Sequence, residues 1–310
     1  MDKLTFLKNE KLIVFGGSGF VGSSIIRRAL SLGMKVTSIS KNQNSGNTIN
    51  DNNLKSYFFD IVNGAFEDIS NDSFDYAINC SGYIDHSISN NDNTVIDNHL
   101  FGLIRIIKHL KKNNLKKFIN IGSSDEYGKI DFPASEYQRE EPHTPYAFSK
   151  TASSHYIQML SRNINFPGIT LRPFLLYGPH QSEERLIPFA IDACLKNKNF
   201  DITEGSQLRD FLYIDDFVDA VFHSLISSTK TDGQVFNISS GLSISIREIV
   251  EMIQLKCDGG SPNFGGKSLH KKESSILLGN NDLAKKFLGW SPKTKISVGL
   301  DLTIDFFSNG

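Results

Sequence analysis

The residues best suited to chemistry are a tyrosine and a lysine four positions apart, Tyr146 and Lys150, in the segment PYAFSK. On a helix this spacing places both side chains on one face. A lysine ammonium beside a tyrosine hydroxyl favours the phenolate, so we expect Lys150 to lower the pKa of Tyr146 toward the range of a general acid or base. The pattern is also common on helix surfaces, so its meaning depends on what surrounds it.

Two serines lie upstream, where a strand-like run ends in the segment INIGSSDEYG. In a parallel α/β sheet, ligands bind beyond the carboxyl ends of the strands. A hydroxyl from this segment would therefore hydrogen-bond the same substrate oxygen as Tyr146.

A glycine-rich turn, GGSGFVG, separates the strand-like run KLIVF from the helix-like segment SSIIRRALSLG. A tight turn, a pyrophosphate close to the backbone, and close helix–strand packing each require a residue without a Cβ atom. The helix N-terminus adds N–H groups and a partial positive charge. We therefore predict a bound dinucleotide rather than an ordinary turn, with contacts from Gly16, Ser18, Gly19, Phe20, Val21 and Gly22.

The end of the second predicted strand bears on the type of dinucleotide. An acidic residue there would bind the ribose 2′-hydroxyl of NAD and repel a 2′-phosphate, but this chain has Ser40 and Lys41. We therefore predict NADP, with NAD as the alternative if both residues only begin a polar loop. Asp60 would bind the adenine amino group or cap the following segment. The remaining predicted cofactor contacts are Ile61, Ser81, Gly82, Tyr146 and Lys150.

Strand-like and helix-like segments alternate along the first part of the chain, up to a sixth predicted strand, GITLRPFLLYG. This alternation predicts βαβ units, and so an α/β fold with a Rossmann-type, doubly wound parallel sheet. The rhythm changes near residue 178. We therefore expect residues 1–178 to form the dinucleotide-binding domain and residues 179–310 mainly a smaller C-terminal substrate-binding lobe, with stretches such as VFNIS returning to the sheet.

The composition restricts the partners. The 310 residues include 33 basic and 34 acidic side chains, a net charge of −1 that provides no field to attract nucleic acid or an anionic membrane. Three scattered cysteines lack metal-ligand spacing, so we expect reduced thiols and no metal. No apolar run approaches the roughly 20 residues of a membrane helix. We expect a cytoplasmic protein with a small-molecule ligand.

The motifs GGSGFVG, GSSDEYG, PYAFSK, RPFLLYGP, RDFLYIDD and FLGWSP together resemble those of the extended short-chain dehydrogenase/reductase family, in the same order. Its members are nucleotide-sugar epimerases, dehydratases and reductases. The resemblance implies that Ser123 is the catalytic hydroxyl, Tyr146 the general acid/base and Lys150 its partner. It also implies a homodimer formed by helices near residues 100–110 and 147–160. The implied sugar-nucleotide contacts are Ser123, Ser124, Tyr146, Leu186, Thr203, Arg209 and His270.

Four positions depart from the family pattern. Leu175 and His99 stand where asparagines are common, His270 replaces an arginine, and Ser40 replaces the NAD-type acid. Leu175 casts most doubt on a standard mode of sugar binding, whereas His270 and the lysines after it can still place positive charge near the diphosphate.

A further departure concerns the reaction. In the 4,6-dehydratases, Asp and Glu directly follow the catalytic hydroxyl residue, but Ser124 and Asp125 occupy those places here. The pair Asp125–Glu126 is displaced by one residue, which turns a side chain to the opposite face of an extended segment. The stretch GSSDEYG instead resembles the 4-keto-6-deoxy sugar-nucleotide reductases.

The leading hypothesis is therefore an NAD(P)-dependent enzyme that reduces the C4 keto group of a nucleotide-linked 4-keto-6-deoxyhexose, with Tyr146 as proton donor. A 4-epimerase with tightly bound NAD uses the same three residues and remains the main alternative. A 4,6-dehydratase and a non-catalytic cofactor-binding protein are weaker alternatives. The sequence leaves open the base, the sugar and the stereochemistry at C4.

Overall fold

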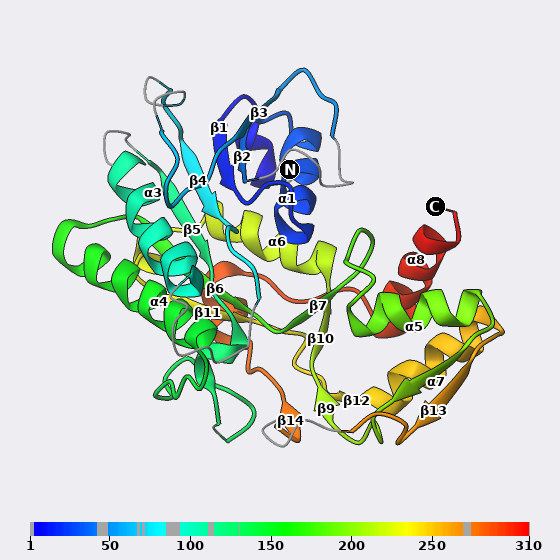
Figure 1. Cartoon of the computed structure of the whole chain (residues 1–310). Coiled ribbons are helices and arrows are strands. Elements are labelled where there is room, and N and C mark those ends of the chain that lie inside the picture. Colours follow the sequence, from blue (N-terminus) through cyan, green and yellow to red (C-terminus); the bar gives the residue numbers. More distant parts are fainter. Residues whose placement is uncertain are drawn as a thin grey trace.

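The computed structural model describes residues 3–41, 49–66, 69, 72–84, 94–110, 115–129, 131–268 and 274–309. A parallel sheet of seven strands forms the larger part of the molecule (Figure 1), in the order β11-β6-β5-β4-β1-β2-β3. From β1 the chain first builds outward to β3 and then restarts at β4 on the other side of β1, which creates the switch point where doubly wound folds bind ligands. The strands are β1 (Lys11–Phe15), β2 (Lys35–Ser40), β3 (Leu54–Phe58), β4 (Tyr76–Asn79), β5 (Lys117–Ile121), β6 (Gly168–Pro173) and β11 (Val235–Ile238).

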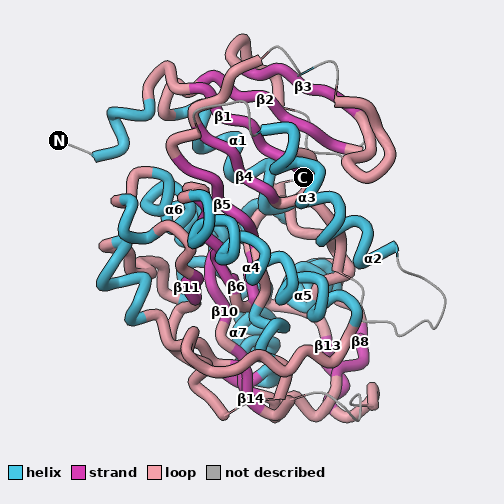
Figure 2. Tube along the Cα trace, turned by 90° about the vertical axis from the view of Figure 1, so that its left-hand side faces the viewer, coloured by secondary structure: helices cyan, strands magenta, loops and turns pink. Residues whose placement is uncertain are grey.

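Helices cover both faces of this sheet, so the predicted α/β fold is confirmed. Leu12 and Val14 of β1 join the core beneath α1 (Phe20–Ser31) and α6 (Ile214–Leu225). Ile13 and Phe15 alternate to the opposite face, beneath α3 (Gly102–Leu110) and α4 (Pro145–Ile164), which run side by side over the sheet in Figure 2. Burial on both faces explains why the inner strands β1, β4 and β5 are largely apolar, whereas the edge strand β3 is mostly exposed.

The segment GITLRPFLLYG forms two strands, so the prediction of a single sixth strand is wrong. β6 ends at Pro173, which has no N–H to donate to a neighbouring strand. The chain then leaves the main sheet, and β7 (Leu175–Tyr177) pairs with β10 (Phe211–Tyr213). This departure starts the path toward the smaller lobe.

The smaller lobe contains short strands and helices from the C-terminal part of the chain. β8 (Asn199–Ile202) pairs with β13 (Ser261–Phe264), and β9 (Leu208–Arg209) lies between β12 (Ile244–Ser245) and β14 (Ile276–Leu277). Its helices are α5 (Leu186–Leu195), α7 (Ile246–Cys257) and α8 (Ile296–Ser308). Among the described helices of the whole chain, none is both long and apolar enough to span a bilayer.

Candidate functional site

The glycine-rich turn between β1 and α1 is packed so closely that side chains are excluded. A Cβ atom on Gly16, whose φ is +82°, would lie 2.7 Å from the carbonyl of Cys80, and one on Gly22 would lie 2.2 Å from the Gly16 carbonyl oxygen. Gly19 is the N-cap of α1 and provides no side-chain hydrogen bond, and the first turn of the helix carries no acidic residue. The turn therefore fits the pyrophosphate of a dinucleotide.

Ser40 and Lys41 at the end of β2 have different environments. Ser40 is buried, and its Oγ accepts a hydrogen bond of 3.0 Å from the N–H of Ser18, so it helps to hold the glycine-rich turn. Lys41 is 66% exposed, and its Nζ lies 2.9 Å from Asp60 Oδ2. Burial alone would raise the pKa of Asp60, but Lys41 and the N–H of Val62 outweigh it and lower that pKa. Lys41 is thus the cation at the ribose end of the predicted cofactor site.

The segments after β3 and β4 lie at the same carboxyl edge of the sheet as Ser40 and Lys41. The carbonyl of Ile61 accepts a hydrogen bond of 3.0 Å from Arg105 Nη1. Ser81 Oγ donates to Asn79 Oδ1 at 2.5 Å, and Gly82 has a φ of +105°. These contacts fix the backbone at the carboxyl ends of the strands, where the sequence predicts the cofactor.

Ser123, Tyr146 and Lys150 come together at the neighbouring end of β5. Ser123 caps a short 3₁₀ helix, η4 (Ser124–Tyr127), and its Oγ accepts the N–H of Asp125 at 3.1 Å. Tyr146 lies in the first turn of α4, a start fixed by the Thr144 cap and by a proline at the beginning of the helix. Lys150 Nζ donates to the Ile121 carbonyl at 2.8 Å and lies 5.9 Å from the centre of the Tyr146 ring.

The electrostatics of Tyr146 differ from the sequence-based expectation. Burial raises its pKa, the Asp125 carboxylate raises it further, and a hydrogen bond from Ser123 and the more distant charge of Arg185 only partly oppose them. Burial also lowers the pKa of Lys150 to about 8. The prediction of a lowered pKa for Tyr146 is therefore wrong for this arrangement, because burial dominates the net shift. The Lys150 ammonium is bonded to the Ile121 carbonyl. Burial and Asp125 thus favour the protonated form of the Tyr146 hydroxyl.

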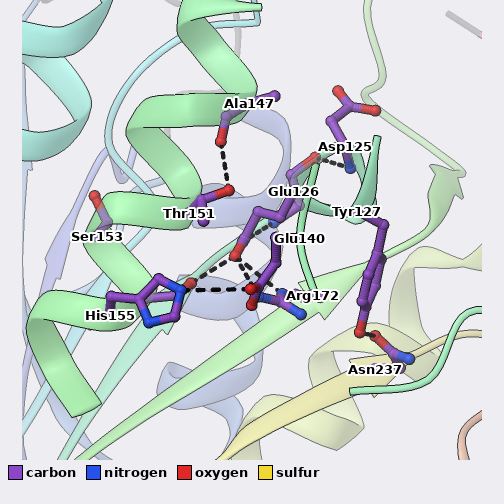
Figure 3. Close-up of polar contacts among 12 residues, drawn as sticks. Asp125, Glu126, Tyr127, Glu140, Ala147, Thr151, Ser153, His155, Arg172 and Asn237 are labelled. Carbon is purple, nitrogen blue, oxygen red and sulfur yellow. Dashed lines mark hydrogen bonds and ion pairs between the residues drawn. The ribbon is translucent and has the colours of Figure 1, made fainter. Parts of the chain in front are cut away.

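Glu126 is tied into a buried polar cluster (Figure 3). Its Oε2 accepts hydrogen bonds from Arg172 Nε at 2.9 Å and Ser154 Oγ at 2.7 Å, and its Oε1 accepts the N–H of Ser123 at 2.9 Å. Arg172 also bonds Glu140 at 2.6 Å. Asp125, the adjacent residue, points away from this cluster in Figure 3. The one-residue displacement seen in the sequence thus directs Glu126 into the core.

The predicted substrate residues lie on several elements. Ser124 is buried in η4, and Leu186 begins α5. In the smaller lobe, Thr203 Oγ1 accepts a hydrogen bond from Gln207 at 3.3 Å, and Arg209 Nη1 donates to the Leu208 carbonyl at 2.9 Å. His270 and the two lysines after it lie outside the described residues.

Sequence reasoning missed two features of this region. Arg185, the N-cap of α5, influences the pKa of Tyr146 although the two residues are far apart in the chain. Its only signal was a charge directly before an apolar helix. Arg172 was also missed, although an arginine within a strand that is otherwise apolar must find a buried partner.

Comparison with known proteins agrees with this geometry. Residues 12–239 match the model of the NAD dependent epimerase/dehydratase family. The chain is 26% identical to a probable dTDP-glucose 4,6-dehydratase of Sinorhizobium fredii, over 96% of this chain and 92% of that protein. It is likewise 26% identical to a UDP-glucose 4-epimerase of Mycolicibacterium smegmatis, over 96% and 99%.

Two solved structures of nucleotide-sugar epimerases are similar to this chain over nearly its whole length. A UDP-N-acetylglucosamine 4-epimerase of Methanobrevibacter ruminantium, in complex with UDP-N-acetylmuramic acid, superposes with a TM-score of 0.88 at 26% identity, over 97% of this chain and 99% of that one. A UDP-glucuronic acid 4-epimerase of Bacillus cereus, in complex with UDP-glucuronic acid and NAD, has a TM-score of 0.87 at 25% identity, over 96% and 99%. The motifs, the fold and the family match therefore agree, and the chain belongs to the NAD dependent epimerase/dehydratase family of extended short-chain dehydrogenase/reductase enzymes.

Proposed function

We propose that this chain reduces the C4 keto group of a nucleotide-linked 4-keto-6-deoxyhexose, with NADPH preferred over NADH. The family match and the relatives named after dTDP-glucose and UDP-glucose support a nucleotide sugar as the substrate class. Lys41, at the ribose end of the cofactor site, supports NADPH. In this proposal Leu186 and Thr203 of the smaller lobe line the pocket for the nucleotide base. Arg209 holds the diphosphate, because a guanidinium binds phosphate in a bidentate manner.

The observation that carries the proposal is the grouping of Tyr146 with Ser123 and Lys150 at the carboxyl end of β5. Burial and the Asp125 carboxylate raise the pKa of the Tyr146 hydroxyl, which favours its role as a proton donor. Reduction of a ketone needs a proton donor at the carbonyl oxygen, whereas oxidation of a hydroxyl needs a base first. When bound, the reduced dinucleotide supplies the hydride for C4. Tyr146 donates its hydroxyl proton to the C4 oxygen, and the Ser123 hydroxyl hydrogen-bonds the same oxygen.

Lys150 has a separate task in this mechanism. After proton transfer the Tyr146 oxygen carries a negative charge in a buried place, which is costly without a counter-charge. Lys150 is buried one helical turn away, and with a pKa of about 8 it is largely protonated at pH 7. We infer that its ammonium stabilises the phenolate until a solvent proton restores the hydroxyl.

The geometry disfavours the dehydratase alternative. That reaction uses an acid and a base directly after the catalytic hydroxyl residue, and Ser124 occupies the first of these places. Glu126 cannot substitute, because its carboxylate is bonded to Arg172, Ser154 and the Ser123 backbone.

Epimerisation at C4 is the second candidate, and the epimerases among the relatives and solved structures favour it. The cofactor content of the purified protein separates the two functions. A reductase exchanges its cofactor in every cycle, so we expect a protein without stoichiometric dinucleotide that oxidises added NADPH when a 4-keto sugar is supplied. Retained stoichiometric NAD, with no NADPH consumption, would overturn the reductase proposal.

Two further assignments belong to the same proposal. We infer a homodimer, because Phe101 beside α3 and Phe148 of α4 are each 51% exposed on neighbouring segments of the predicted interface. The cytoplasmic location expected from the sequence is part of the same proposal. We also retain residues 1–178 and 179–310 as the two functional units, with β11 as the segment of the second unit that completes the main sheet.

A further inference from the structure

His99 occupies a constrained place beside Tyr146. It lies in the middle of η3 (Asp97–Phe101), a π-helical turn of a kind that is frequent at functional sites. Its carbonyl accepts a hydrogen bond of 3.2 Å from Ser153 Oγ of α4, and the residue is 4% exposed. The backbone and side chain of His99 are therefore both held by the surrounding structure.

The imidazole ring connects two parts of the proposed site. It meets the Tyr146 ring edge to face, with ring centres 5.1 Å apart and an angle of 81° between the planes. On another side it lies against Gly82 of the predicted cofactor segment, where a Cβ atom would come within 2.1 Å of His99 Cε1. His99 thus contacts both the proposed proton donor and the segment that would hold the cofactor.

The hydrogen bonds of the ring determine its tautomer. Nε2 lies 2.8 Å from the Tyr83 carbonyl oxygen, and because a carbonyl can only accept, Nε2 must carry the hydrogen. Burial and the nearby Lys150 ammonium lower the pKa of His99 to about 3, so the ring is neutral at ordinary pH. Nδ1 is therefore an unprotonated acceptor.

This acceptor is buried but unsatisfied. Among the described residues, none donates a hydrogen bond to His99 Nδ1. Leaving a buried polar atom unpaired is costly, and such atoms in native structures usually meet a water or a ligand. We therefore expect this lone pair to meet a donor on a bound water or ligand.

We propose that His99 is a positioning residue whose Nδ1 accepts a hydrogen bond from a hydroxyl of a bound ligand and thereby orients that ligand beside Tyr146. The inference rests on the proposed function for the identity of the ligands, which are the dinucleotide and the sugar nucleotide. Both carry hydroxyls, on the ribose and on the hexose respectively. An asparagine, common at this place in the family, offers an amide oxygen as acceptor, so histidine keeps an acceptor in a larger and more rigid group.

Nitrogen NMR of ¹⁵N-histidine-labelled protein tests the tautomer and the ligand contact directly. The chain has 8 histidines, and the spectrum of His99→Asn identifies the signals that belong to position 99. We expect an unprotonated Nδ1 and a protonated Nε2 without ligand. We expect the Nδ1 signal to move when NADPH alone is added if the donor is the ribose, or when dTDP-4-keto-6-deoxyglucose alone is added if it is the hexose. A protonated Nδ1, or a signal that neither ligand moves, would overturn the proposal.

Two variants then separate positioning from packing. His99→Asn keeps an acceptor, whereas His99→Phe keeps the aromatic contact with Tyr146 and loses both nitrogens. If the acceptor matters, kcat/KM of the asparagine variant stays near that of the wild type, and the phenylalanine variant loses about tenfold or more, the worth of a hydrogen bond of about 1.4 kcal/mol. If the ring only fills space, the order is reversed and the proposal fails.

Stability and binding measurements keep this test independent of the proposed reaction. Thermal unfolding shows whether either variant has lost its fold, and the NADPH dissociation constants report the ligand contact without turnover. If the wild type reduces no 4-keto sugar, the proposed function fails while the NMR signals still decide the role of His99.

Discussion

The carboxylate of Glu126 and the guanidinium of Arg172 form an ion pair from which solvent is entirely excluded, with Oε2 2.8 Å from Nη2. The pair connects η4, which follows Ser123, to β6 in the main sheet. It therefore fixes the segment that carries the proposed catalytic serine. Of the two adjacent carboxylates, Asp125 raises the pKa of Tyr146 more than Glu126 does.

Replacing Glu126 should destabilise the fold strongly. Glu126→Gln leaves the Arg172 charge buried with one carboxylate partner fewer, and breaking a buried pair in this way costs about 3–5 kcal/mol. Urea unfolding measures the loss. Asp125→Asn is the matched control one residue away, and because Asp125 lies outside the buried cluster, we expect its stability to change by no more than about 0.5 kcal/mol. Equal losses in the two variants would contradict this account of the pair.

Because Lys150 is buried, the free energy of unfolding should depend on pH in the alkaline range. Burial lowers the pKa of Lys150 to about 8 in the folded chain, whereas a solvent-exposed lysine has a pKa of 10.5. Between these values the unfolded chain therefore binds a proton that the native chain lacks. Native stability therefore rises with pH across this window, and below pH 8 the cost of burying the charge is fully present.

The variant Lys150→Met isolates this effect, because methionine fills a similar space without a charge. We expect the variant to be more stable than the wild type at pH 7, and the difference in unfolding free energy to shrink as the pH approaches 10.5. Urea unfolding at pH 7 and pH 9.5 provides the comparison. A difference that does not vary with pH would show that the Lys150 ammonium is not destabilised in the native state.

The fold and the site residues Ser123, Tyr146 and Lys150 were predictable because each is indicated by a short stretch of sequence. Inner strands of the main sheet such as β1 are apolar runs, and the sequence GGSGFVG is typical of the turn that the structure shows between β1 and α1. The contacts that tune the site are not local. Glu126 and Arg172 are 46 residues apart, and the sequence around either residue does not predict the other as its partner. The raised pKa of Tyr146 likewise depends on burial by several elements, which the YxxxK spacing alone does not contain.

Cofactor preference should depend on Lys41. The Asp60 carboxylate and a ribose 2′-phosphate would both bind the Lys41 ammonium. Lys41→Glu should therefore weaken NADPH binding about tenfold or more relative to NADH binding, as expected for loss of a charged hydrogen bond. Fluorescence titration with both dinucleotides measures the ratio. Lys35→Glu makes the same charge change at the exposed opposite end of β2 and should leave the ratio unchanged. If the two variants behave alike, the preference does not arise at Lys41.

The proposed dimer should depend on the exposed aromatic residues beside α3 and on α4. Phe148→Glu places a charge in the predicted interface, where burial of an unpaired charge is unfavourable. We expect the variant to become monomeric in light scattering coupled to size-exclusion chromatography. Leu242→Glu is the control, because Leu242 lies within residues 179–310, away from the predicted interface, and is 75% exposed. We expect this variant to keep the molecular mass that the wild type has in solution. A monomeric wild type would refute the dimer itself.

The proposed hydride transfer from NADPH to C4 is tested most directly by following deuterium from labelled NADPH into the sugar. The wild type is incubated with NADPH deuterated at the transferable position and a nucleotide-linked 4-keto-6-deoxyhexose, and the product is analysed by mass spectrometry and NMR. We expect one deuterium at C4 for each NADPH oxidised, and a rate about 10²–10⁴-fold lower for Tyr146→Phe, which lacks the proton donor. Interconversion of C4 epimers without NADPH consumption, or a Tyr146→Phe variant as fast as the wild type, would contradict the proposed reaction.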